Sequence, residues 1–275
     1  MSLSLGVIGA GRIAQTLINP LIEKGDFLPG NILGVVGNEG SIPLALDQFP
    51  EGVRIVSAND SDADQVWSAP VKLLAIKPQQ LIDIEEKKGI PESAGPLRKP
   101  LLISVLAGVN LKRLQRVFPG HTCVRAVPNM PVVVRAGLTG LSWGDDCTND
   151  LRLVVKRFFN PISEVFELPE EQLDAFLALT SSGPAYIALI AEALADGAVA
   201  AGLPRLLASH LANRTLEGTA LLLKEKDLHP GELKDMVASP AGTTIAALRH
   251  LEMASVRSAL IEAVVAAAER SRELA

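Results

Sequence analysis

The sequence predicts an α/β protein in two parts: a doubly wound domain over residues 1–168 and an all-helical domain over residues 169–275. Two observations lead to this fold class. Short apolar runs alternate with helix-like segments through the first part, which is typical of a parallel sheet covered on both faces. After about Pro169 no strand pattern is left, and apolar residues recur at helical spacing to the end of the chain.

The strand candidates of the first part are short apolar runs bounded by glycine or turn residues. A helix is expected over Ile13–Lys24 because its apolar residues recur at helical spacing and Gly25 follows as a stop. Two further runs, Thr139–Trp143 and Glu164–Phe166, are expected as edge strands around a helix over Asn149–Phe159. The six main candidates are Leu3–Ile8, Ile32–Val36, Val53–Val56, Val71–Ile76, Leu101–Leu106 and Val124–Val127.

The second part is expected to hold five helices, several of which open at a proline. The stretch Ala185–Ala201 is apolar nearly all round, with Glu192 and Asp196 as its only charged residues. A helix of this kind must be buried on several faces, so we expect a homodimer through the helical domain. The predicted helices are Pro184–Ala201, Pro204–Lys226, a short one from Pro230, Ala241–Leu251 and Ser255–Glu273.

Composition excludes several classes of function. The 275 residues carry a net charge of −5 without a basic block, which argues against a nucleic-acid surface. Cys123 and Cys147 are expected to be inert thiols in a reducing compartment. The four histidines show no metal-ligand spacing, so no metal site is predicted. With no targeting segment or membrane span expected, the predicted location is the cytoplasm.

A glycine motif lies at the turn from the first strand to the first helix. It reads Gly9-x-Gly11-x-x-Ala14, a variant of the Rossmann dinucleotide-binding pattern. Gly9 would permit the tight turn, Gly11 the close approach of a diphosphate, and Ala14 close helix–strand packing. An anion would then bind the free N–H groups of the helix. The alternative is a tight strand–helix turn that binds no ligand.

Cofactor choice between NADPH and NADH depends on the residues after the second strand. Asn38 and Ser41 can donate to a 2′-phosphate, whereas Glu39 would repel one and could accept from the ribose of NAD. The pattern leaves both cofactors open.

Three loops follow predicted strands at one edge of the sheet, where ligands of such folds bind. They are residues 75–78, 106–109 and 127–131. We expect them beside the nicotinamide and its ribose, although Lys77 could equally be a solvated loop lysine. In the helical part, residues 239–245 place hydroxyl and small side chains before a helix, which indicates an anion-binding nest or an ordinary helix cap.

Several longer motifs are similar to those of the pyrroline-5-carboxylate reductase family. They are Ser181–Tyr186, Glu192–Gly197 and, above all, His229–Ile245. Together with the glycine motif, residues 75–78 and Arg125–Pro131, the resemblance covers nearly the whole chain.

The resemblance implies reduction of the cyclic imine 1-pyrroline-5-carboxylate to L-proline by a reduced nicotinamide, NADPH or NADH, in a homodimer that the family often builds into larger rings. It implies that Thr244 hydrogen-bonds the ring nitrogen as the catalytic residue. The substrate-binding set that it implies is Ser239, Gly242, Thr243, Thr244 and Glu170, of which Glu170 has an alternative as a surface acid at a helix start. The cofactor-binding set is Gly9, Ala10, Gly11, Arg12, Ile13, Asn38, Asn59, Ala75, Ile76, Lys77, Pro78, Ala107 and Gly108.

The chain departs from the family pattern at three positions. Ala241 replaces a usual glycine, where we expect an ordinary φ to suffice, and Leu106 replaces a smaller residue, which would tighten the cofactor pocket. Glu39 is not expected of a member that prefers NADPH. Two other functions stay open from the residues: a β-hydroxyacid dehydrogenase, although Pro184–Ala201 lacks the lysine base of that class, and a non-catalytic dinucleotide sensor.

Overall fold

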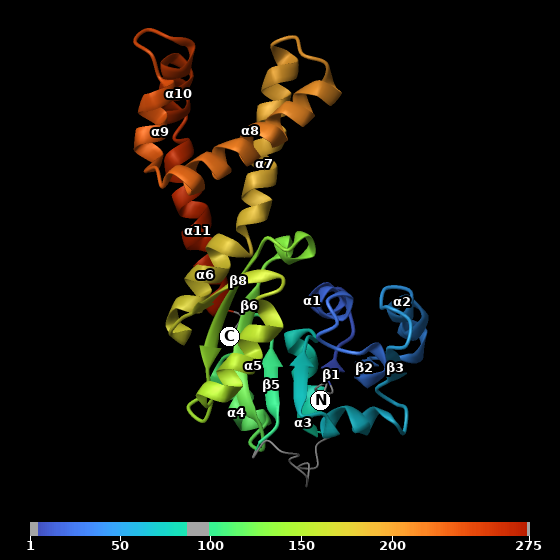
Figure 1. Ribbon diagram of the computed structural model, residues 1–275. Helices are drawn as coiled ribbons and strands as arrows, with labels where there is room; N and C mark the ends of the chain where they lie inside the picture. Colours follow the sequence, from blue (N-terminus) through green and yellow to red (C-terminus); the bar gives the residue numbers. More distant parts are fainter. Residues whose placement is uncertain (1–4, 87–98, 274–275) are drawn as a thin grey trace. The chain divides into compact units, whose positions relative to one another are not determined.

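The computed structural model describes residues 5–86 and 99–273. The chain forms two compact units. Unit 1 comprises the residues up to Ser181 together with the end of the chain from Ala268, and unit 2 comprises Ser182–Ala267. Unit 1 contains the sheet with its helices, and unit 2 consists of helices (Figure 1).

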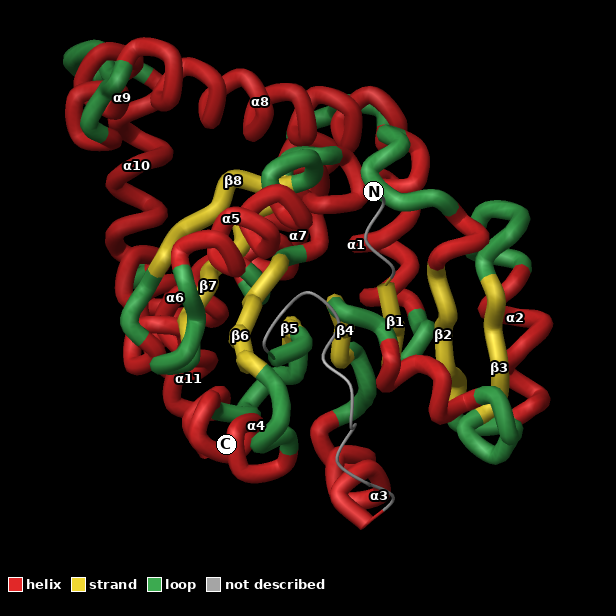
Figure 2. Tube along the Cα trace, turned by 60° about the horizontal axis from the view of Figure 1, so that its bottom comes forward, coloured by secondary structure: helices red, strands yellow, loops and turns green. Residues whose placement is uncertain are grey.

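Unit 1 is built on one eight-stranded sheet with the order β3-β2-β1-β4-β5-β6-β7-β8, which Figure 2 shows as a row of strands. The first six strands are parallel, β7 runs antiparallel to β6, and β8 runs parallel to β7. The strands are β1 (Leu5–Ile8), β2 (Ile32–Val36), β3 (Arg54–Ser57), β4 (Val71–Leu74), β5 (Leu101–Ser104), β6 (Thr122–Pro128), β7 (Gly137–Trp143) and β8 (Ser163–Glu167).

The order of the strands reverses at β1, which lies between β2 and β4. In an open parallel sheet, ligands bind at such a switch point, outside the carboxyl ends of the strands. The glycine motif follows β1 directly and therefore lies at this position. The helices of the unit are α1 (Arg12–Glu23), α2 (Ile42–Leu46), α3 (Leu81–Glu86), α4 (Leu111–Val117), α5 (Asn149–Phe159) and α6 (Leu173–Thr180).

The strand predictions are confirmed to within two residues at either end, and residues 3–4 of the first run lie outside the described residues. One expectation is wrong: the run Thr139–Trp143 belongs to β7, which is not an edge strand but pairs with both β6 and β8. β8 pairs with the other side of β7 and takes the edge position in its place, while α6 packs on β7. A Cβ on Gly140 would lie 2.9 Å from the Phe176 ring, so the missing side chain lets the helix pack directly on the strand.

The core of unit 1 lies on both faces of the sheet, in two clusters of buried apolar residues. Apolar strands such as β5 are buried throughout, as expected for a parallel sheet. Lys72 on β4 is an exception that the sequence analysis missed. Its side chain is fully buried and its Nζ donates to the Ala69 carbonyl. Burial lowers the pKa of Lys72 to about 8, because the charged form loses hydration.

Unit 2 is helical, and no strand occurs among its described residues, as predicted. α7 and α8 pack against each other through a small cluster in which Ala195, Ala208 and Ala212 are buried. The Tyr186 hydroxyl lies 3.4 Å from the Ala263 carbonyl. The helices are α7 (Gly183–Ala200), α8 (Arg205–Lys226), α9 (Pro230–Val237), α10 (Thr243–Met253) and α11 (Val256–Glu273), whose end belongs to unit 1.

The sequence analysis expected no membrane span, whereas Glu170–Ala200 is long and apolar enough to be a candidate by length and composition. The stretch is not one helix. A 3₁₀ turn, Glu170–Gln172, comes before α6, and the chain breaks again at Ser181 and Ser182 before α7. A spanning helix keeps its backbone hydrogen bonds unbroken through the bilayer, whereas this stretch forms a 3₁₀ turn and two separate helices.

The limits of the two units differ from the predicted boundary between residues 168 and 169, which stays a prediction. α6 packs on β7 and therefore belongs to unit 1. The end of α11 joins the same unit, where the Ser271 hydroxyl donates to Asp174 Oδ1 at 2.7 Å.

Candidate active site

The glycine turn has the geometry that the motif predicts. Gly9 has a φ of +92°, and a Cβ there would lie 2.7 Å from the backbone of Ala75, so only glycine fits between β1 and β4. The N–H groups of Gly9 and Ala10 both donate to the Val35 carbonyl, which fixes the turn to β2. Ala14 lies in the first turn of α1 and is fully buried, as its role in close helix–strand packing requires.

Gly11 is the N-cap of α1. The space around it is open, because a Cβ added to Gly11 would meet no atom within 4 Å. No described side chain caps the helix, and its first turn carries no acidic residue. The first N–H groups of an α-helix lack intrahelical partners, so this end can accept a diphosphate. The residues present therefore fit a dinucleotide.

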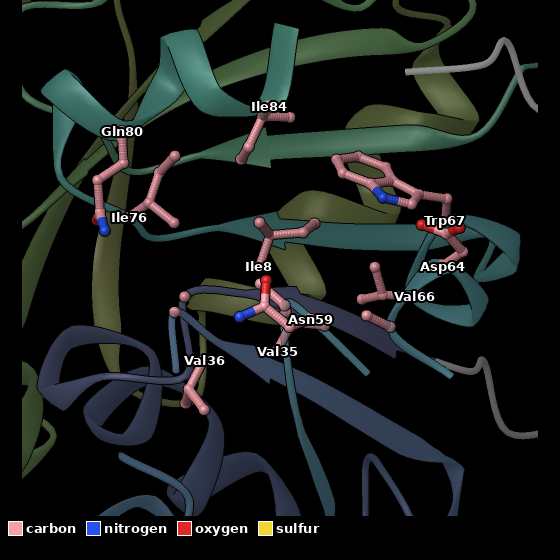
Figure 3. A pocket seen from close by; sticks show the side chains of 14 residues that line it. Ile8, Val35, Val36, Asn59, Asp64, Val66, Trp67, Ile76, Gln80 and Ile84 are labelled. Atoms are coloured by element: carbon pink, nitrogen blue, oxygen red, sulfur yellow. The ribbon is translucent and has the colours of Figure 1, made fainter. Parts of the chain in front are cut away.

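A cavity of about 430 Å³ lies beside the turn, at the carboxyl ends of the first strands (Figure 3). Its walls are mostly apolar, with Ile8, Val36 and Ile76 among them, and the amides of Asn59 and Gln80 add polar groups. Such a cavity suits the nucleoside portion of a dinucleotide. Gly9 and Asn59, both predicted from the sequence, meet here, whereas Trp67 at the same cavity was not predicted.

The turn after β2 is held by its own side chains. Asn38 Oδ1 accepts from both the backbone N–H and the hydroxyl of Ser41, each at 3.1 Å. The Asn38 amide nitrogen is thereby oriented as a donor, while Glu39 beside it is exposed. The turn after β2 thus combines the Asn38 donor with the Glu39 carboxylate, which would repel a 2′-phosphate, as the sequence indicated.

The loop after β4 approaches the first cavity through Ile76, while Ala75 faces Gly9. The Lys77 side chain is exposed, and its backbone N–H donates to Gln80 Oε1 at 3.0 Å. Pro78 begins the short 3₁₀ turn that follows. The loop supplies the cavity with an aliphatic side chain, and its lysine points to solvent.

A second cavity of about 840 Å³ lies within the same unit, on the α1 side of the sheet. It brings together the start of α1 and the loops after β5 and β6, two of the three predicted loops. Among its lining residues are Arg12, Ile13, Leu106, Ala107, Pro128, Asn129 and Met130. Leu106 is buried in this wall, as expected of a residue that narrows the pocket.

Asn129 lines the second cavity and fixes the loop after β6 through two hydrogen bonds. From the sequence it was predicted only as a member of that loop. Its amide donates to the Thr180 carbonyl at 3.0 Å and accepts from the Leu138 N–H at 2.8 Å. The Ser181 hydroxyl reaches the Pro128 carbonyl at 3.3 Å. These bonds join the loop after β6 to the end of α6, so that Ser181, the first residue of the Ser181–Tyr186 motif, is held in unit 1.

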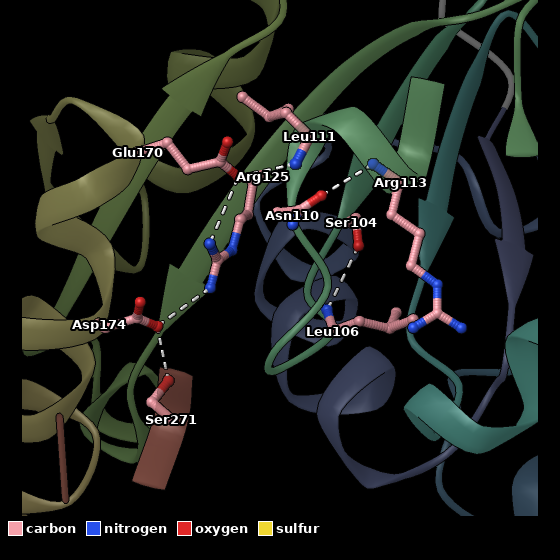
Figure 4. Close-up of polar contacts among 9 residues, drawn as sticks. All are labelled: Ser104, Leu106, Asn110, Leu111, Arg113, Arg125, Glu170, Asp174 and Ser271. Carbon is pink, nitrogen blue, oxygen red and sulfur yellow. Dashed lines mark hydrogen bonds and ion pairs between the residues drawn. The ribbon is translucent and has the colours of Figure 1, made fainter. Parts of the chain in front are cut away.

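Glu170 lies at the start of the 3₁₀ turn before α6, where its carboxylate has two partners (Figure 4). Its Oε1 accepts from the backbone N–H of Leu111 at 2.7 Å and lies 3.4 Å from Arg125 Nη1. The residue is therefore engaged with the loop that carries Ala107 and Gly108.

The predicted substrate residues of unit 2 lie together at the start of α10. Gly242 is its N-cap, no described side chain caps it, and Thr243 and Thr244 are its first residues. A Cβ on Gly242 would lie 2.3 Å from Ser239 Oγ, so glycine keeps this hydroxyl close to the helix end. The first N–H groups of α10 and the nearby Ser239 hydroxyl thus provide donors at the helix end, which suits a carboxylate.

The expectation for Ala241 is wrong. Its φ is +54°, in the left-handed region, so an ordinary φ does not suffice at this position. The turn needs that conformation to bring the Gly242 N–H back to the Ser239 carbonyl at 3.0 Å. Glycine adopts it without the steric cost that the Cβ of alanine adds.

The remaining titratable groups take structural roles. His229 Nδ1 accepts from the Gly231 N–H at 3.1 Å, which confirms its part in helix entry. Asp196 pairs with Arg205 at the start of α8. Both cysteines are buried, and burial raises the pKa of Cys147. Among the described residues, no group of His, Cys, Asp and Glu could hold a metal ion.

A doubly wound sheet whose glycine turn opens beside a nucleoside-sized cavity defines a nicotinamide-dependent oxidoreductase. Residues 4–108 match the family model for NADP oxidoreductase, coenzyme F420-dependent, and residues 170–274 match the model for pyrroline-5-carboxylate reductase dimerisation. The chain is 43% identical to the pyrroline-5-carboxylate reductase of Synechocystis sp., over 100% of this chain and 99% of that protein. It belongs to the pyrroline-5-carboxylate reductase family.

Solved structures agree with this membership. A pyrroline-5-carboxylate reductase from Coxiella burnetii is 32% identical, with a TM-score of 0.84 and coverage of 100% of this chain and 99% of that one. A pyrroline carboxylate reductase from Plasmodium falciparum, solved with NADP bound, is 25% identical, with a TM-score of 0.84 and coverage of 99% and 98%. The predicted family, fold and enzyme class are thus confirmed, and they replace the two alternative functions.

Proposed function

We propose that the chain reduces 1-pyrroline-5-carboxylate to L-proline with hydride from NADPH, and that the residues at the start of α10 hold the substrate. The bound nicotinamide supplies the hydride, which adds to the carbon of the C=N bond, and the ring nitrogen gains a proton. The protein's task is then to position a small ring and its carboxylate.

The observation that carries the proposal is the uncapped start of α10. Gly242 leaves the first N–H groups of the helix open, and Ser239, Thr243 and Thr244 add three hydroxyls. A carboxylate at this point would gain charge-assisted hydrogen bonds of roughly 1.5–3 kcal/mol each, which exceeds the roughly 0.3–1 kcal/mol typical of a helix dipole alone. We assign the carboxylate to Ser239 and the backbone of Gly242–Thr244, and the ring nitrogen to the Thr244 hydroxyl.

The cofactor is assigned to unit 1. Gly9–Ile13 would hold the diphosphate and Asn59 the nucleoside end, while Ala107 and Gly108 would contact the nicotinamide end. NADPH is favoured because the Asn38 amide nitrogen is oriented as a donor and the P. falciparum relative was solved with NADP. Glu39 opposes a 2′-phosphate, so we expect NADH to be used as well, with lower efficiency.

The enzyme is proposed to act in the cytoplasm as a homodimer joined through unit 2, and dimers of this kind can assemble into a ring. Support comes from the match of residues 170–274 to the dimerisation model. The large apolar residues that α7, α8 and α11 expose also support it, including Leu189, Leu206 and Ile261.

The experiment is Thr244→Ala, tested by imine reduction followed through nicotinamide absorbance. Losing a hydrogen bond to the reacting nitrogen should lower kcat about tenfold to a hundredfold. Binding of NADPH, measured by fluorescence titration, should stay within about twofold because unit 1 is untouched. Thr219→Ala, an exposed position on α8, is the matched control and should behave as wild type. Unchanged turnover in Thr244→Ala would remove this hydroxyl from the mechanism.

A further inference from the structure

The loop between β5 and α4 carries Ala107 and Gly108, and polar contacts hold it on either side. Gly108 has a φ of +69°, so the chain turns sharply here. Within the loop's own segment, the Leu106 N–H lies 3.4 Å from Ser104 Oγ, and Asn110 Oδ1 accepts from the Arg113 N–H at 2.8 Å. Both contacts are local. The start of the loop is also tied to β4, since the Val105 N–H donates to the Leu74 carbonyl at 3.0 Å, and the loop's apolar side chains Leu106 and Val109 are buried.

Glu170 attaches the end of the loop to a distant part of the chain. Its carboxylate accepts from the N–H of Leu111, the first residue of α4, at 2.7 Å and across 59 residues of sequence. Figure 4 shows the bond reaching from the start of the 3₁₀ turn to this residue. A carboxylate accepting from a backbone N–H is among the stronger hydrogen bonds in proteins, so this contact contributes substantially to holding the loop's end.

Arg125 holds the carboxylate in place from the sheet. Its side chain is only 3% exposed, and its two terminal nitrogens lie 3.4 Å from Glu170 and 3.5 Å from Asp174. Asp174 in turn accepts from the Ser271 hydroxyl of α11 at 2.7 Å. A buried guanidinium between two carboxylates keeps both from turning into solvent, because leaving it unpaired would be strongly unfavourable.

We infer that Glu170 is a positioning residue for hydride transfer, which fixes the Ala107–Gly108 loop against the nicotinamide with Arg125 as its counter-ion. The inference rests on the proposed function and deepens it. It also gives Glu170 a different role from the substrate contact that the family resemblance implies, since its strongest bond goes to the protein backbone. Small displacements of groups that orient a reacting pair lower rates steeply, so the loop's attachment matters for kcat.

The test compares Glu170→Ala and Glu170→Gln with Glu171→Ala, an exposed neighbour in the same turn. Glu170→Ala should weaken NADPH binding about fivefold to tenfold and lower kcat at least about tenfold. The KM for the imine at saturating NADPH should stay within about twofold. Glu170→Gln keeps an acceptor oxygen for Leu111 and should recover most of the lost kcat, while Glu171→Ala should match wild type.

Two results would overturn the inference: a raised imine KM with unchanged NADPH binding, which marks a substrate contact, or wild-type kinetics in Glu170→Ala. Should Glu170→Ala fail to fold, Ser271→Ala provides a milder variant that loosens Asp174 alone, and the same NADPH titration should then show about twofold weaker binding. Because NADPH binding is measured without substrate, this result is independent of the proposed reaction. A wild-type enzyme inactive on the imine would instead contradict the proposed function.

Discussion

Units 1 and 2 are stabilised in different ways. Unit 1 buries aliphatic and aromatic residues on both faces of its sheet, in two large clusters. The buried cluster of unit 2 consists of three alanines, while leucines and isoleucines of the same helices are exposed. Leu206 on α8 is 88% exposed, an extreme value for a large apolar side chain.

The difference indicates which unit has a sufficient core of its own. Burial of apolar area contributes roughly 25 cal/mol per Å², so unit 1 gains a full hydrophobic core within one chain. Unit 2 alone gains little of this contribution, because the large apolar side chains of its helices stay exposed until another surface covers them. We therefore expect unit 2 to be stabilised by the proposed dimer and unit 1 to be largely independent of it.

The largest effect is expected from a charge placed on the exposed apolar surface of unit 2. Leu189 on α7 is 67% exposed, and Leu189→Glu would bury an unpaired carboxylate in the dimer. A penalty of at least about 3 kcal/mol would raise the dimer dissociation constant about hundredfold. Light scattering across a dilution series measures it.

Leu44 on α2 provides the matched control, since it is 73% exposed but belongs to unit 1. Leu44→Glu should leave the dimer intact. If both variants stay dimeric, or if both dissociate, the contrast between the two units is wrong.

An intermediate effect is expected from the buried Lys72 in unit 1. Its pKa in the folded protein is about 8, below the roughly 10.4 of an unfolded chain. Between these values the unfolded state binds more protons, so stability should rise with pH, by about 3 kcal/mol from this group. Below pH 8 Lys72 is protonated in both the folded and the unfolded state, so the full desolvation penalty of the buried charge lowers the stability.

Lys72→Met isolates this contribution. Urea unfolding of both proteins at pH 8 and pH 10 should show the variant more stable at pH 8 and the difference shrinking at pH 10. A difference that stays constant over this range would mean that Lys72 does not change its charge there.

The smallest effect concerns the α10 turn of unit 2. Ala241 holds a φ of +54°, which costs alanine roughly 1 kcal/mol relative to glycine. Ala241→Gly should therefore stabilise the protein by up to about 1 kcal/mol and raise the Tm by a few degrees, measured by calorimetry. A lower Tm would show that the greater freedom of glycine in the unfolded chain outweighs the relieved strain.

Much of the fold followed from local pattern. Strands such as Ile32–Val36 and the helix Asn149–Phe159 were predicted at their observed limits, because apolar period and flanking turns define them without reference to the rest of the chain. The interior position of β7 did not follow, since it depends on pairing with β8, which local pattern does not show. α6 itself was missed because its apolar residues merge with the run that continues into α7.

The candidate site shows the same limit. The Gly9 turn and the clustering at α10 were predictable from residue type, because few residues other than glycine fit such turns. The partners of Glu170 were not, since Leu111, Arg125 and Asp174 meet it only through the sheet order. The left-handed Ala241 was missed because alanine gives no sign of an unusual φ.

The reversal of β7 has a further consequence for how the chain is routed. β8, which runs parallel to β7, leaves the sheet at the edge away from the glycine turn, and α6 brings the chain back until Ser181 lies beside Pro128. Within unit 1, α6 thus sets where the chain returns to the loop after β6. Because each residue of an α-helix turns the chain by about 100°, deleting a single residue from it would carry the Thr180 carbonyl away from the Asn129 amide that donates to it.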